Sequence, residues 1–179
     1  SESSNINFET DGIKTYVDGD FLRAEGTTLG ADNGIAVAMI MAILEDDNMP
    51  HPPIEAIFTT DEEKGCIGAD RLSRIKCPFK DLRYVIQLDR RGANDCVFYD
   101  CDNTDFVKYI EKFGFVETWG TFTDISYLCP EWGVAGANLS VGYEDEHSAI
   151  ETLHVNAWQA TFEKVKTILS EKEFPYFKY

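Results

Sequence analysis

Residues 27–44 read TTLGADNGIAVAMIMAIL, and this stretch decides the fold that we expect. Its first part, residues 27–34, is a glycine-rich turn that contains Asp32. Its second part, residues 35–44, is so apolar that it predicts a helix buried on most of its sides. The sequence therefore places an acidic turn directly before a helix of the expected core.

Strand-like and helix-like segments alternate along the rest of the chain. The turn pairs Asp11-Gly12 and Gly19-Asp20 predict one or two short hairpin strands before residue 26. Apolar runs predict strands at 54–60, 83–88, 96–99 and 134–141, and polar or amphipathic runs predict helices at 69–74, 104–113 and 157–171. This alternation predicts an α/β domain, a three-layer sandwich in which helices flank a mixed, mostly parallel central sheet.

The composition is that of a folded acidic protein. The chain has 179 residues, a formal net charge of −16, and 44% hydrophobic and 13% aromatic residues, which suit one compact domain over residues 1–179. The acidity excludes nucleic acid as an expected partner, because phosphate binding needs a basic surface. No apolar run approaches the roughly 20 residues of a membrane helix.

The cysteines indicate ordinary thiols. Five are present, and they form neither a CxxC pair nor a disulfide framework: Cys66, Cys77, Cys96, Cys101 and Cys129. The first residues show no export signal, so we expect a cytoplasmic protein.

Acidic residues follow the expected strands or open turns, at Asp32, Glu62, Glu63 and Asp89, and His147 lies in a later turn. In open α/β sheets, ligands collect at the carboxyl ends of strands. Carboxylates and a histidine are ligand types for zinc or another divalent transition metal. Because adjacent glutamates diverge, one of the pair can bind metal while the other acts as a base.

Each of these residues also has an ordinary structural interpretation. Asp32 could cap the helix that follows it, and Glu62 and Glu63 could form a solvated helix start. Asp89 could pair with the arginines next to it, and His147 could be an exposed turn residue. Spacing and composition alone therefore leave the metal site open.

Four segments, in order, resemble the co-catalytic di-zinc exopeptidase superfamily of aminopeptidases, dipeptidases and tripeptidases. They are TLGADNGIAVAMIMAILED at 28–46, IEAIFTTDEEKGCIGAD at 54–70, QLDRRG at 87–92, and the stretch from FTDISYL at 122–128 to GYEDEHSAIETL at 142–153. The resemblance implies the phosphorylase/hydrolase-like zinc peptidase fold and hydrolysis of short peptides at a chain terminus. Only 58 residues separate Asp89 from His147, which resembles branches without an inserted lid domain.

The resemblance also implies a role for each candidate residue. Asp32 would bridge two zinc ions, and Glu63 and His147 would complete the binding of one of them. Asp89 would bind the other ion, and Glu62 would be the general base. Co²⁺ or Mn²⁺ could take the place of zinc, and a homo-oligomer is compatible with the family.

One element of the superfamily pattern is not matched. The pattern has a His-x-Asp motif before the bridging aspartate, whereas His51, His147 and His154 all follow Asp32. We interpret His51 and His154 as turn and helix-start residues, and we expect the chain to lack its first strands and the first metal histidine. Two other functions stay open: a non-catalytic binding module on the same fold, and an amidohydrolase acting on acylated amino acids.

Overall fold

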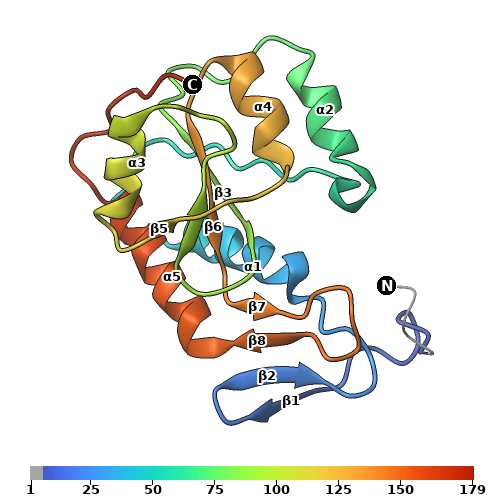
Figure 1. Cartoon of the computed structure of the whole chain (residues 1–179). Helices are drawn as coiled ribbons and strands as arrows, with labels where there is room; N and C mark the ends of the chain where they lie inside the picture. The colour runs from blue at the N-terminus through green and yellow to red at the C-terminus, as the bar shows by residue number, and fades with distance from the viewer. Residues whose placement is uncertain (1–5) are drawn as a thin grey trace.

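The computed structural model describes residues 6–179, whose strands form two sheets (Figure 1). One sheet is antiparallel, with the order β1-β2-β8-β7. The other has the order β3-β6-β4-β5, in which β3 runs parallel to β6, β4 runs parallel to β5, and β4 runs antiparallel to β6. The strands are β1 (Thr15–Asp18), β2 (Phe21–Ala24), β3 (Val85–Arg90), β4 (Asp95–Val97), β5 (Val116–Glu117), β6 (Gly136–Ser140), β7 (Tyr143–Glu144) and β8 (Thr152–His154).

The helices and the mixed sheet confirm the predicted α/β class. The helical elements are α1 (Ala31–Glu45), a short 3-10 turn η1 (Glu62–Lys64), α2 (Ile67–Ser73), α3 (Thr104–Glu111), α4 (Asp124–Trp132) and α5 (Val155–Leu169). Helices were predicted close to the observed positions of α1, α2, α3 and α5. Helix α4 was not predicted, although its first residues lie in one of the segments that resemble the exopeptidases. None of the helices in residues 6–179 is long and apolar enough to span a lipid bilayer.

Helices cover both faces of β6, which is the most buried strand of the mixed sheet. Gly136 faces α4, where a Cβ atom at this position would clash with the Cys129 sulfur. Because side chains alternate along a strand, Leu139 points the other way, into a core that contains Met39 of α1 and Ile168 of α5. Figure 1 shows α4 and α5 on opposite sides of the sheet. The cysteines are free thiols, four of them buried, as expected.

Two expectations for the apolar stretches were wrong. Residues 54–60 form no paired strand, and Phe58 is 52% exposed. Helix α1 is buried through Ala36, Met39 and Ile43, but one of its sides exposes apolar side chains: Val37, Met41 and Leu44. The reason is physical, since an apolar run is buried only where another segment covers it, and no segment of residues 6–179 covers these.

Candidate metal site and its surroundings

Three of the predicted metal ligands converge at one point. The Nε2 atom of His147 lies 2.8 Å from Oδ2 of Asp32 and 2.7 Å from Oε1 of Glu63. Their candidate ligand atoms all lie within 4.8 Å of one another, although the residues come from the start of α1, from η1 and from the loop after β7. Two carboxylate oxygens and one imidazole nitrogen are a donor set that suits zinc, so the residues present fit a divalent metal ion.

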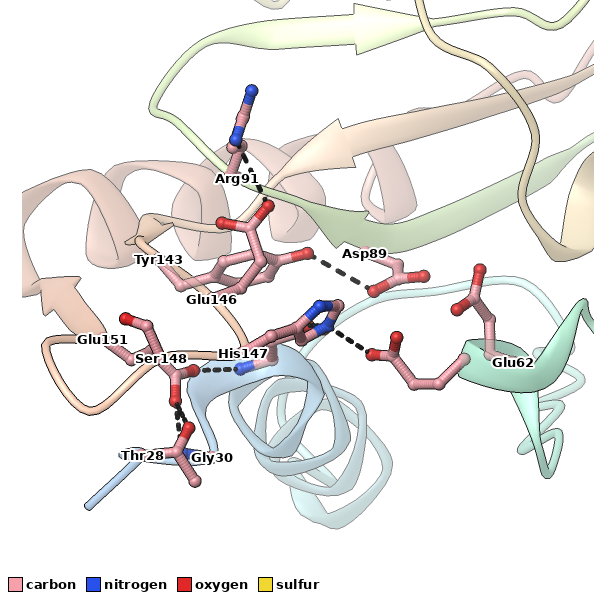
Figure 2. A network of polar contacts seen from close by, with 12 residues as sticks. Thr28, Gly30, Glu62, Asp89, Arg91, Tyr143, Glu146, His147, Ser148 and Glu151 are labelled. Carbon is pink, nitrogen blue, oxygen red and sulfur yellow. Dashed lines mark hydrogen bonds and ion pairs between the residues drawn. The ribbon is translucent and has the colours of Figure 1, made fainter. Parts of the chain in front are cut away.

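All five predicted site residues line one cavity of about 460 Å³. Figure 2 shows Glu62, Asp89 and His147 around this space. Asp89 reaches it from the carboxyl end of β3, where the Tyr143 hydroxyl lies 3.5 Å from its Oδ1 atom. Glu62 and Glu63 are consecutive residues of η1, and both line the cavity.

The alternative interpretation of Asp89 as a partner of the adjacent arginines is wrong. The guanidinium of Arg90 pairs with Asp95 at 3.6 Å, and that of Arg91 pairs with Glu146 at 3.4 Å. Asp89 instead accepts hydrogen bonds from uncharged groups, which leaves its charge without a cation among the residues described. An acidic group in this position favours binding of a metal ion.

Burial and mutual repulsion raise the pKa values of the carboxyl groups in the cavity. Burial raises the pKa of Asp32 to about 6, and the charge of Glu63 adds to the effect. Burial, reinforced by the charges of Glu62 and Asp32, raises the pKa of Asp89 to about 8. Burial is also the main cause of the raised pKa of Glu62. For His147, partial burial lowers the pKa, but the contacts with Glu63 and Asp32 outweigh it and leave the pKa raised.

These shifts predict that the metal-free protein loses stability as the pH rises. A carboxyl group with a raised pKa in the folded state favours folding in its protonated form, and this contribution is lost as the group ionises. For Asp32 the loss runs from about pH 4 to about 6, and for Asp89 from about pH 4 to about 8. Thermal unfolding with a chelator should therefore show a midpoint that falls by roughly 5 °C or more from pH 5 to pH 8.5.

The variant Asp89→Asn should flatten this pH dependence and raise the midpoint at pH 8.5, because asparagine does not ionise. Asp47→Asn is the matched control, since Asp47 is exposed and lies outside the cavity. If the unfolding midpoint of Asp89→Asn fell with pH as steeply as that of the wild-type protein, the prediction would be wrong.

Glu151 is a site residue that the sequence did not reveal. It is 2% exposed, and its carboxylate accepts hydrogen bonds from the Gly30 N–H at 2.8 Å, the Asp32 N–H at 2.9 Å and the Thr28 hydroxyl. Figure 2 shows Glu151 beside Thr28 and Gly30. Glu151 thus anchors the glycine-rich turn that presents Asp32 to the cavity.

The two remaining histidines have the structural roles expected of them. The ring of His154 packs edge-on against Phe21 with 4.9 Å between centroids, and its Nδ1 atom accepts from the Ala157 N–H at the start of α5. The Nδ1 atom of His51 lies 2.6 Å from the Pro52 carbonyl oxygen in the proline-rich turn. Neither residue lines the cavity.

Comparisons with known proteins find both a sequence family and curated relatives that this chain matches in part. The sequence model of Peptidase family M28 matches residues 11–113. Over 62 residues the chain is 50% identical to the cytosol non-specific dipeptidase of Escherichia coli (strain K12), a match that covers 35% of this chain and 13% of that protein. The chain thus matches only a small part of this curated relative.

Two solved structures share the fold. Aminopeptidase PepT from Bacillus cereus ATCC 10987 has a TM-score of 0.68 at 16% identity, over 89% of this chain and 76% of that one. The TET1 peptidase of Pyrococcus horikoshii has a TM-score of 0.64 at 21% identity, over 89% of this chain and 53% of that one. At these identities the likeness concerns the fold alone.

Proposed function

The chain belongs to Peptidase family M28, and from this premise we propose that it hydrolyses peptide bonds at a chain terminus with the help of divalent metal ions. Its substrates would be short peptides, cleaved in the manner of an aminopeptidase, dipeptidase or tripeptidase. The observation that carries the proposal is the convergence of Asp32, Glu63 and His147 within 4.8 Å, in a cavity that also contains Glu62 and Asp89.

The donor set suggests how the residues share the metal ions. Asp32, Glu63 and His147 would hold one zinc ion, and Asp32 would bridge to a second ion held by Asp89. Co²⁺ or Mn²⁺ would suit the same oxygen and nitrogen donors. Among the residues described, no second imidazole lines the cavity beside Asp89.

Glu62 is the proposed general base. Two divalent metal ions, when bound, would supply Lewis-acid activation of the scissile carbonyl and of water. Glu62 takes a proton from the attacking water as the new C–O bond forms. It returns the proton to the amine as the C–N bond breaks. Partial burial raises the pKa of Glu62. The raised pKa lies closer to neutral pH, where a base can both accept and release a proton.

The names of the relatives support two further parts of the proposal. One relative is a cytosol dipeptidase, and the TET1 peptidase assembles into a tetrahedron or a large octahedral shell. A cytoplasmic location and self-association into a homo-oligomer are therefore proposed for this chain as well.

The test is a dipeptide panel assayed with and without metal. We expect the protein to hydrolyse dipeptides. A chelator should abolish this activity and Zn²⁺, Co²⁺ or Mn²⁺ should restore it, because the proposed reaction needs a divalent ion to activate the scissile carbonyl and the attacking water. Glu63→Gln should bind metal at least about 10-fold more weakly and lose activity in proportion. Product formation by chromatography and bound metal by mass spectrometry are the two measurements.

Asp61→Asn is the matched control, because Asp61 pairs with Lys64 at 2.8 Å and lies outside the cavity. N-acetylated amino acids in the same panel separate a peptidase from an amidohydrolase. A protein that binds no divalent metal and cleaves no peptide would show the proposal to be wrong and would favour a binding module.

A further inference from the structure

The side chain of Gln87 connects β3 to the start of α4, and its hydrogen bonds allow only one orientation of the amide group. Its Oε1 atom accepts from the Ile125 N–H at 3.1 Å, and its Nε2 atom donates to Asp89 at 3.0 Å and to the Thr123 hydroxyl at 2.6 Å. A backbone N–H can only donate, so the amide oxygen must face Ile125 and the NH₂ group must face the cavity. The two protons of the NH₂ group are thus donated to Asp89 and to the Thr123 hydroxyl.

The Thr123 hydroxyl lies between two carboxylates. It is buried, because Thr123 is 3% exposed, and its Oγ1 atom lies 3.4 Å from Oε1 of Glu62 and 3.4 Å from Oδ2 of Asp89. Since the oxygen accepts from Gln87, its one proton is free for donation to either carboxylate. Two carboxylates repel each other, and a shared neutral donor stabilises them at close range.

The backbone holds this hydroxyl in place. The Thr123 N–H donates to the Ser126 hydroxyl at 2.9 Å, and that hydroxyl donates back to the Thr123 carbonyl. The next residue, Asp124, accepts from the Thr59 hydroxyl, which ties the start of α4 to the segment that leads into η1. The Thr123 oxygen is therefore part of a rigid frame around Glu62 and Asp89.

We propose that Thr123 is a positioning residue, through which Gln87 sets the spacing between the Glu62 and Asp89 carboxylates. The inference rests on the proposed function, in which Glu62 is the base and Asp89 holds a metal ion. Thr123 acts through these two groups. Its loss should therefore affect turnover and metal binding more than substrate binding.

The experiment compares Thr123→Val, which removes the hydroxyl at nearly constant shape, with Thr123→Ser, which keeps it. Thr161→Val is the matched control, because Thr161 is fully buried on α5 and its hydroxyl donates to the Ser140 carbonyl at 2.8 Å, away from the cavity. The measurements are kcat and KM for a dipeptide that the wild-type protein cleaves, and the affinity for Co²⁺ from its absorption spectrum.

Thr123→Val is expected to lower kcat by roughly 10- to 100-fold with KM within about threefold, and to weaken Co²⁺ binding by roughly 10-fold. Thr123→Ser should recover most of both losses, and Thr161→Val should change neither. Wild-type kcat and Co²⁺ affinity in Thr123→Val, or equal losses in Thr161→Val, would overturn the inference.

A second variant covers the case in which Thr123→Val does not fold. Gln87→Met removes the amide at similar size and should give the same two losses, and where both variants fold the double variant should lose little more than either one. Additive losses would overturn the inference. If the wild-type protein cleaves no peptide, the proposed function is wrong. The Co²⁺ affinities of the same variants then decide the inference on their own.

Discussion

Replacing Glu62 with glutamine should reduce kcat by roughly 10²- to 10⁴-fold while leaving metal binding intact, since this is the range typical of a lost general base. Glutamine has nearly the same shape as glutamate but cannot accept the proton of the attacking water. The Glu62 side chain contacts the Cys66 sulfur at 3.5 Å and the Thr123 hydroxyl at 3.4 Å. Both contacts can survive the substitution, so the loss reports on the proton rather than on the fold.

The measurement pairs steady-state kinetics on a dipeptide with metal content by mass spectrometry. Glu63→Gln is the informative comparison, because Glu63 is the adjacent glutamate and lies 2.7 Å from His147. We expect Glu62→Gln to keep its bound metal while its kcat falls. We expect Glu63→Gln to lose both bound metal and activity. If Glu62→Gln keeps its metal and more than about a tenth of wild-type kcat, another group is the base.

The candidate site was largely predictable because its residues lie next to regular elements. Asp32 stands at the start of an apolar helix, and Asp89 ends a strand whose carboxyl end faces the cavity. Adjacent Glu62 and Glu63 share a short turn, and the structure brings both to the same cavity. Local patterns identified these residues as candidates, because ligands collect at the carboxyl ends of strands in such sheets, and the resemblance to the exopeptidases then gave each candidate its expected role.

The features that were missed depend on distant partners. The Glu151 carboxylate accepts from the Asp32 N–H, which lies 119 residues earlier, and no local pattern distinguishes it from a solvated glutamate. Helix α4 contains Pro130, which obscures a helical pattern, and its start is set by Ser126 and by contacts with β3. Residues 54–60 have the apolar pattern of a buried strand, but strand pairing requires a neighbour that the pattern itself does not supply.

Glu151→Ala should cost the metal-free protein about 3 kcal/mol of unfolding free energy, the size expected for a broken buried hydrogen-bond network. Removing the carboxylate leaves the N–H groups of Gly30 and Asp32 and the Thr28 hydroxyl without their acceptor. It also leaves a cavity in the buried interior. Because the same turn presents Asp32, metal affinity should fall by roughly 10- to 100-fold as well.

Glu151→Gln separates the hydrogen bonds from the cavity, since it fills the same space. One carboxylate oxygen accepts from Asp32 and the other from Gly30 and Thr28, so a glutamine NH₂ group must face a backbone N–H in either orientation. We expect about half of the stability loss of Glu151→Ala, measured by urea unfolding with a chelator. Exposed Glu173, changed to alanine, is the control. Unfolding free energies within about 0.5 kcal/mol of wild type for both Glu151 variants would mean that this carboxylate does not hold the Asp32 turn in place.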